Sequence, residues 1–271
     1  MPTLRDVAAT SALPRLEWQM LWQHVLQVGR AWLIAHDTDP LPDGALARYR
    51  VLEARRLAGE PMAYILGSRE FMGHDFTVTP AVLIPRPETE LLVETALDYL
   101  HGRKAPAVLD LGTGSGAIAI SIALAGPSAR VIATDVSTDA LEVARRNAQR
   151  LGAPVEFLSG SWYDALSEAK AFDLIVSNPP YISAADDHLR RGDLRFEPAR
   201  ALTDGLDGLD AIRTIIQGAG RRLNPKGGLF VEHGWDQATQ VRDLMTSAGF
   251  AQVTSLRDLA GIERVTGGTY N

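Results

Sequence analysis

Two short motifs carry residue types that could bind a flat amino group and a nucleotide-like ligand. The first, Asn178-Pro179-Pro180-Tyr181, follows an apolar run at residues 172–177 that predicts a buried strand. The prolines end this strand, because proline cannot donate to a ladder of backbone hydrogen bonds. We predict that a planar –NH2 group donates to the Asn178 oxygen and to a proline carbonyl, while Tyr181 covers one face of the group.

The second motif, DLGTGSG at residues 110–116, also follows an apolar strand. Its glycines permit a tight turn against which a ligand can lie, and the next helix directs N–H groups at that ligand. A dinucleotide fingerprint would read G-x-G-x-x-G. The observed G-x-G-x-G is more usual for S-adenosylmethionine, whose carboxylate can use exposed N–H groups. The predicted cofactor contacts are Asp110, Gly112, Thr113, Gly114, Ser115 and Gly116, with Asp110 ordering the backbone or holding the amino group.

Two residues after later strands extend the predicted cofactor site. Asp135 ends the next predicted strand, where its carboxylate can accept both ribose hydroxyls. Trp162 follows a strand predicted at residues 155–158; its indole either stacks on adenine or caps the core. His233 ends another strand, and we predict a structural, hydrogen-bonded histidine there rather than a base.

Together the motifs predict methyl transfer from S-adenosylmethionine to a planar nitrogen. Asn178, Pro179 and Tyr181 are the predicted catalytic residues, and Asn178 is also a predicted cofactor contact. Its carboxamide is essentially non-basic, so it cannot be a general base. It can accept a hydrogen bond that strengthens as positive charge develops on the nitrogen.

The order of predicted elements indicates an α/β protein with a small N-terminal helical domain. Residues 1–68 are predicted to be helical, residues 69–88 an extended or hairpin linker, and residues 89–271 the catalytic domain. In that domain strands and helices alternate, which predicts a mostly parallel sheet covered on both faces. Ligands bind such sheets beyond the carboxyl ends of the strands. The strands are predicted at 107–111, 130–134, 155–158, 174–177, 228–232 and 251–256, and the helices at 91–100, 117–125, 139–151 and near 208–223 and 235–248.

Composition narrows the classes of function. The 271 residues are 46% hydrophobic and 22% charged, as is usual for soluble globular proteins. The net charge of −6 argues against nucleic acid as the main substrate, since a protein that wraps a phosphate backbone usually has a basic face. The segment 186–200 carries four arginines, one of them Arg191, balanced by four acids.

Other absences concern cysteines, metals and membranes. The chain has no cysteine, which excludes disulfides, thiolate metal sites and a catalytic cysteine. Its six histidines are scattered, and we predict no metal. The N-terminus lacks the pattern of a secretory signal, and no apolar stretch approaches a membrane span. We therefore expect a cytoplasmic protein without membrane partners.

The chain resembles the peptide chain release factor glutamine methyltransferases. The resemblance covers nearly the whole chain, although the first forty residues match only loosely. Its most particular segments are IPRPETE at residues 84–90 and RFEP at 195–198, whereas the Asn-Pro-Pro-Tyr motif is shared with adenine-N6 and RNA methyltransferases. The other matching segments are GEPMAYILG at 59–67, FMG at 71–73, DLGTGSGAIAI at 110–120, GDL at 192–194, DGLD at 207–210 and EHG at 232–234.

The resemblance implies a Rossmann-like class I methyltransferase sheet and an N-terminal domain that helps receive a release factor. Family members methylate the glutamine amide of a Gly-Gly-Gln motif, with S-adenosylhomocysteine as the second product. We expect a monomer that uses no metal. The family's contacts with cofactor or substrate fall on Gly112, Gly114, Gly116, Asp135, Trp162 and Asn178, and residues Asn178, Pro179, Pro180 and Tyr181 would form the glutamine pocket.

Three alternatives remain open at the level of sequence. An enzyme that methylates an exocyclic amine of adenine or guanine in DNA or RNA would use nearly the same chemistry on a flipped base. A silent S-adenosylmethionine-binding module should have a damaged amine-binding motif, yet residues 178–181 are intact. A dehydrogenase is disfavoured by the glycine spacing.

Overall fold

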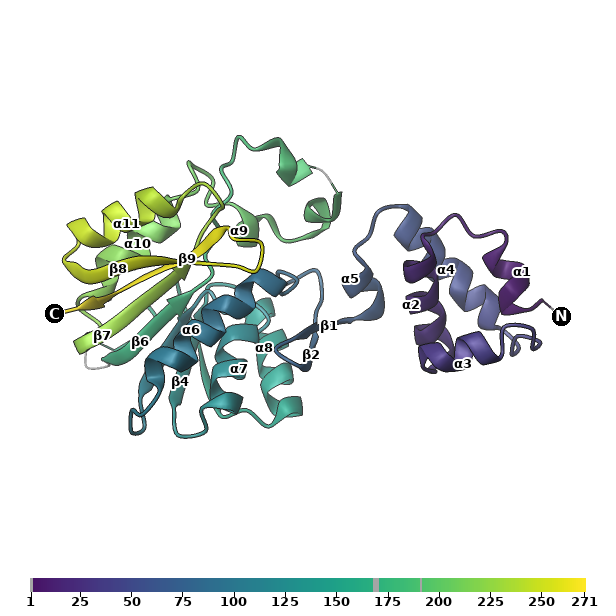
Figure 1. The fold of residues 1–271 in the computed structure, drawn as a ribbon, viewed down its shortest axis with the longest axis horizontal. Coiled ribbons are helices and arrows are strands. Elements are labelled where there is room, and N and C mark those ends of the chain that lie inside the picture. Colours follow the sequence, from purple (N-terminus) through teal and green to yellow (C-terminus); the bar gives the residue numbers. More distant parts are fainter. Residues whose placement is uncertain (1, 168–170, 191) are drawn as a thin grey trace. The chain divides into compact units, whose positions relative to one another are not determined.

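The computed structural model describes residues 2–167, 171–190 and 192–271, so Arg191 of the balanced charged segment lies outside the described residues. The chain forms two compact units, and the boundary between them along the sequence lies between Ser68 and Arg69. Each unit has its own buried core, and Figure 1 shows the elements of both.

The first unit contains five helices among its described residues. Its core contains Trp22 and Tyr49, whose stacked rings lie 4.4 Å apart between centroids and join α2 to α4. Beside them the Tyr49 hydroxyl donates to Glu53 Oε1 at 2.9 Å, which satisfies a buried carboxylate. The helices are α1 (Leu4–Ala8), α2 (Arg15–Leu26), α3 (Arg30–Ala35), α4 (Ala45–Leu57) and α5 (Met62–Leu66).

A short hairpin follows, formed by β1 (Ser68–Phe71) and β2 (His74–Thr77). The turn between the strands places Met72 and Gly73 at positive φ. Phe71 and Phe76 are fully buried edge to face, with 6.0 Å between ring centroids. Both rings belong to the same core cluster as α6 and α7, so residues 69–77 of the hairpin are part of the second unit.

The second unit is built on a seven-stranded sheet with the order β5-β4-β3-β6-β7-β9-β8. Strands β3 to β7 pair in parallel, and β9 is antiparallel to both of its neighbours. The α/β fold class is therefore confirmed. The strands are β3 (Ala107–Leu111), β4 (Arg130–Asp135), β5 (Val155–Ser159), β6 (Phe172–Ser177), β7 (Leu223–Glu232), β8 (Phe250–Arg257) and β9 (Glu263–Tyr270).

Strand β9 was absent from the sequence-based prediction. Its centre is Gly267-Gly268, and paired glycines predict a turn rather than a strand interior. In the structure the Phe230 ring occupies the space above Gly267, where an added Cβ would lie only 1.9 Å from the ring. A tertiary contact therefore explains the glycine.

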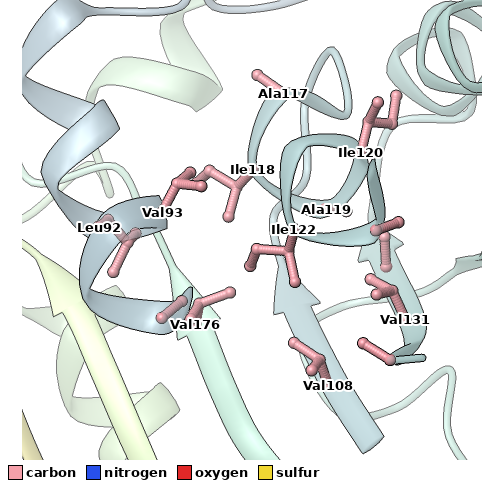
Figure 2. Packing of buried hydrophobic residues seen from close by; sticks show 14 of the residues in the cluster. Leu92, Val93, Val108, Ala117, Ile118, Ala119, Ile120, Ile122, Val131 and Val176 are labelled. Atoms are coloured by element: carbon pink, nitrogen blue, oxygen red, sulfur yellow. The ribbon is translucent and has the colours of Figure 1, made fainter. Parts of the chain in front are cut away.

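Helices cover both faces of the sheet (Figure 1). Residues of α6, α7 and α8 form one core with alternate strand residues such as Val108, Leu174 and Val176, and Figure 2 shows the α7 side chains packed over β3 and β4. Residues of α10 and α11 form the other core with Leu109 and Ile175. Successive side chains of a strand point to opposite faces of the sheet, so each strand contributes residues to both cores.

The remaining elements of this unit are η1 (Pro87–Thr89), α6 (Glu90–Leu100), α7 (Ala117–Ala125), α8 (Thr138–Leu151), η2 (Asp187–Arg190), η3 (Gly192–Phe196), α9 (Ala199–Leu202), α10 (Asp210–Ala219) and α11 (Ala238–Ser247). Among the described residues, none of the helices has the length and apolar character needed to span a bilayer.

Candidate functional site

The second unit has a cavity beyond the carboxyl ends of its parallel strands. It lies where the strand order changes direction, between β3 and β6. It encloses about 1070 Å³ of empty space, which includes solvent at its mouth. The lining residues are Ala81–Leu83, Pro85, Arg86, Thr89, Gly112–Ser115, Ala117, Ile118, Asp135–Ser137, Ala140, Gly160–Trp162, Asn178, Pro180, Pro198, Arg200 and Ala201.

The glycine loop connects β3 to α7 at one wall of this cavity. Gly112 and Gly114 line it at φ +72° and +56°, and a Cβ on Gly114 would meet nothing within 4 Å. Gly116 does not line the cavity; it caps α7 at φ +84°, where a Cβ would lie 2.7 Å from Ile120 Cδ1. Glycine is required at this cap for close helix packing.

Several loop N–H groups are already engaged within the protein. The N–H groups of Gly112 and Thr113 donate to Thr134 O at 2.9 and 3.0 Å, and that of Gly116 donates to Thr113 O at 2.8 Å. The expectation that exposed loop N–H groups receive a ligand carboxylate is wrong for these three groups. They hold the shape of the loop instead.

Asp135 lines the cavity at the end of β4 and also braces the glycine loop. Its Oδ2 accepts from Gly114 N at 2.9 Å and its Oδ1 from Ser137 N at 2.8 Å. Burial raises the pKa of this carboxyl despite these two bonds. Each carboxylate oxygen can accept a second hydrogen bond, so a vicinal diol could still donate to Asp135.

Trp162 and Val136 give the same cavity apolar surface. The Trp162 ring lies beside Gly112, where an added Cβ would be 3.5 Å from the indole. Trp162 also packs against the second core, so this one side chain both lines the cavity and caps the core. Its φ of +46° is rare for a non-glycine residue and typical of functional sites. Val136 is 61% exposed although it borders this site.

Asp110 is fully buried below the glycine loop and is not among the cavity-lining residues. The Thr113 hydroxyl donates to Asp110 Oδ2 at 2.6 Å. Burial raises the pKa of Asp110 to about 7. This geometry supports the predicted ordering of the backbone, whereas a direct contact between Asp110 and a ligand in the cavity is not supported, because Asp110 does not line the cavity.

Asn178 follows β6 and brings its side chain to the cavity shared with Gly112, Gly114 and Asp135. Its Nδ2 donates to Thr89 Oγ1 at 3.1 Å. Because this bond engages the amino end of the carboxamide, Oδ1 is the end available to a donor in the cavity. The strand tip therefore offers an acceptor beside the glycine loop.

The other residues of the Asn-Pro-Pro-Tyr motif have different positions. Pro180 lines the cavity, whereas Pro179 and Tyr181 are not among its lining residues. The Tyr181 ring packs against the second core, and its hydroxyl donates to Glu232 Oε1 at 3.2 Å. Gln237 Nε2 donates to Tyr181 O at 3.0 Å, which holds the backbone of the motif.

An ion pair between Arg86 and Glu197 joins two walls of the cavity. The sequence alone did not assign a role to either residue. Glu197 Oε1 accepts from Arg86, and its Oε2 accepts from Ile84 N at 3.0 Å. The Glu197 side chain is fully buried. The segments IPRPETE and RFEP supplied the signal, because each contains one partner of this pair.

Asn147 on α8 is another residue that the sequence-based prediction missed. It is fully buried and bonds both polar groups of Thr77: its Oδ1 accepts from Thr77 N at 2.8 Å, and its Nδ2 donates to Thr77 O at 3.0 Å. The same Nδ2 donates to Ser115 O at 3.0 Å. One carboxamide thus ties the hairpin to the glycine loop.

His233 is a buried, hydrogen-bonded residue outside the cavity lining. Its ring nitrogens lie 2.9 Å from Gly234 O and 2.8 Å from Thr266 Oγ1. Burial lowers its pKa. Both nitrogens are therefore occupied by structural partners.

Comparisons with known proteins agree with these two units. The family model described as PrmC N-terminal domain matches residues 6–67, and the one described as Methyltransferase small domain matches residues 87–205. A release factor glutamine methyltransferase of Bordetella pertussis is 62% identical over 99% of both chains. The chain belongs to the release factor glutamine methyltransferase family.

Two further comparisons place that family in its sequence and fold context. The enzyme of the same name from Neisseria gonorrhoeae is 54% identical over 99% of this chain and 98% of its own. A Thermus thermophilus 16S rRNA N2 G1207 methyltransferase, solved with AdoMet and guanosine, is 22% identical with a TM-score of 0.57. The match covers 75% of this chain and 50% of the Thermus thermophilus chain. At this identity, the similarity shows only that the two proteins share a fold.

Proposed function

We propose that this protein transfers a methyl group from S-adenosylmethionine to the side-chain amide nitrogen of the glutamine in the Gly-Gly-Gln motif of peptide chain release factors. Membership of the family supports this substrate. The observation that carries the chemistry is the Asn178 carboxamide, whose oxygen is left available in the cavity that also contains Asp135 and the glycine loop.

The residues of the cavity fit S-adenosylmethionine. Asp135 has acceptor capacity left for the ribose hydroxyls, and Val136 and Trp162 offer apolar surface for adenine. Gly112 and Gly114 leave open space beside them. When bound, this cofactor supplies a methyl group on a sulfonium: the C–N bond forms as the C–S bond breaks, and S-adenosylhomocysteine leaves.

The protein's contribution is positioning and charge stabilisation. A glutamine amide nitrogen is a weak nucleophile, because its lone pair is delocalised into the carbonyl. Asn178 Oδ1 accepts one N–H of that amide and stabilises the positive charge that develops on the nitrogen. Orienting the nitrogen in line with the methyl group can contribute up to about 7–11 kcal/mol. The methylated amide then loses its extra proton to water, so no protein base is required.

The finer assignments are part of the same proposal. The Pro179 carbonyl is a second acceptor for the amide, and Pro180 and the Tyr181 segment shape the glutamine pocket. Thr113 and Ser115 complete the cofactor loop, while Asp110 orders it from below. The first unit, residues 1–68, helps to receive the release factor. We further propose a cytoplasmic monomer that needs no metal and no direct contact with nucleic acid.

The deciding experiment combines the purified protein, S-adenosylmethionine and a purified release factor, followed by peptide mass spectrometry. We expect the mass of one added methyl group on the glutamine of the Gly-Gly-Gln motif. Release factor with that glutamine replaced by alanine is the matched control and should gain nothing. Methyl incorporation into rRNA or DNA, without modification of the release factor, would refute the proposal.

A further inference from the structure

Gln237 is a buried polar residue at the N-cap of α11 that has no part in the chemistry described above. Its exposed fraction is 8%, and it does not line the cavity. A buried carboxamide is energetically unfavourable unless its polar atoms are hydrogen-bonded. The partners that satisfy Gln237 therefore indicate what this residue does.

The Gln237 carboxamide bonds the backbone of three separate loops. Its Nε2 donates to Tyr181 O at 3.0 Å and to Gly208 O at 3.3 Å, and its Oε1 accepts from Gly234 N at 2.8 Å. These partners lie 56, 29 and 3 positions away in the sequence. One side chain therefore joins the segment after β6, the loop before α10 and the turn after β7.

The loop before α10 lies directly against the carbonyl group of Tyr181. Gly208 has a φ of +83°, and a Cβ there would collide with Tyr181 O and lie 3.1 Å from Ser183 N. Only glycine allows the two backbones to approach this closely. Asp204 fixes the shape of the same loop, because its Oδ1 accepts from Leu206 N at 2.8 Å and from Gly208 N at 3.1 Å. The Tyr181 carbonyl is thus held between a shaped loop and the Gln237 side chain.

The Asn-Pro-Pro-Tyr motif is consequently held at both of its ends. At the first end, Asn178 Nδ2 donates to Thr89 Oγ1 at 3.1 Å. At the other end, Tyr181 O accepts from Gln237. The two prolines between these ends have no N–H group with which to anchor themselves. Their position depends on the bonds at the two ends of the motif.

We propose that Gln237 is a positioning residue for the amide of the substrate. By fixing Tyr181 O, it fixes the preceding prolines and with them the Pro179 carbonyl, the second acceptor for the amide. Gln237 acts through this backbone and does not itself contact substrate or cofactor. The inference rests on the proposed function, since it concerns the pocket that receives a glutamine –NH2 group.

The junction requires two donor hydrogens and one acceptor oxygen on a single side chain, which is what a carboxamide supplies. A methionine at position 237 would have similar length but no hydrogen-bond donor. An ionised glutamate would keep the acceptor for Gly234 N and lose both donors to Tyr181 O and Gly208 O. The two substitutions therefore separate the bonds to the motif from the bond within the turn.

The first test is Gln237→Met. We expect kcat on release factor to fall by about 10- to 100-fold, as for displacement of a reacting group by a change outside the site. The Kd for S-adenosylmethionine should stay near the wild-type value, because neither Gln237 nor its three backbone partners line the cavity. Calorimetry gives this Kd together with the number of binding sites. Expressing kcat per binding site keeps the test decisive in a partly unfolded preparation.

The second test is Gln237→Glu, measured in the same way. If Gln237 acts through Tyr181 O, this variant should lose kcat as Gln237→Met does. A wild-type kcat in Gln237→Glu would overturn the proposal, because the bond to Gly234 alone would then suffice. Gln240→Met is the matched control; it makes the same change at an exposed position of α11 and should leave kcat and the Kd unchanged.

These outcomes separate this inference from the proposed function. The wild-type protein in the same assay tests the function: no methyl on release factor would refute both. An active wild-type protein with an equally active Gln237→Met variant would refute only the role of Gln237. A loss of activity in Gln237→Met that is fully explained by a raised Kd for S-adenosylmethionine would also refute it.

Discussion

Asn147 offers a sharp test of how the cofactor loop is supported. Asn147→Ala removes three hydrogen bonds to the backbone of Thr77 and Ser115 from a fully buried position, and also a longer one of 3.5 Å from Arg150. At roughly 1 kcal/mol for each bond, we expect the free energy of unfolding to fall by about 3 kcal/mol. Asn147→Asp should be worse, because a carboxylate would face two backbone carbonyl oxygens.

Urea unfolding followed by circular dichroism measures this loss, and calorimetry measures the Kd for S-adenosylmethionine. We expect that Kd to rise, because Ser115 belongs to the loop that lines the cavity. Gln149→Ala on the same helix is the matched control; its side chain is exposed, and the change should stay within about 0.5 kcal/mol. A stability of Asn147→Ala within that range would refute the role of Asn147 as a structural tie.

Three other predictions concern the ribose contact, the motif backbone and a buried carboxyl. Asp135→Ala should raise the Kd for S-adenosylmethionine by about 10- to 100-fold, as for loss of a charged hydrogen-bond acceptor, and an unchanged Kd by calorimetry would count against the ribose contact. Gly208→Ala should depress kcat, because its Cβ would lie 2.4 Å from Tyr181 O at a φ of +83°; wild-type kinetics would contradict this. Burial raises the pKa of Glu232 from 4.5 to about 7, so the folded protein holds this proton more tightly than the unfolded chain. The contribution of this group to the free energy of unfolding, on the order of 3 kcal/mol, is fully present below about pH 4.5 and is lost as the pH rises through about 7. Between about pH 5 and about pH 8, the urea midpoint of Glu232→Gln should therefore fall less than that of wild type. Parallel curves for the two proteins would refute the raised pKa of Glu232.

Much of the fold could be predicted because the strands of the second unit are continuous apolar runs. The strand at residues 107–111 and the helix at 117–125 have the predicted bounds. Strand β9 could not be predicted in this way, since its glycines are explained only by the Phe230 ring above them. The hydrophobic periodicity of a segment indicates which of its own residues are buried. It does not indicate which distant side chain, such as the Phe230 ring, packs against a glycine.

The site shows the same division between local and tertiary information. Asp135, Trp162 and Asn178 follow strands whose carboxyl ends share one edge, so topology alone predicts that they meet. Thr89 and Asn147 act through partners 89 and 70 positions away in sequence, respectively. No local pattern around either residue indicates its partner.

The central claim is that the Asn178 oxygen orients the substrate amide for methyl transfer. The most direct measurement compares Asn178→Ala with wild type for kcat on release factor and for the Kd of S-adenosylmethionine. We predict a kcat at least about 100-fold lower, as for removal of a preorganised polar contact, with the cofactor still bound at near wild-type affinity. A wild-type kcat, or a loss of activity fully explained by weaker cofactor binding, would contradict this account.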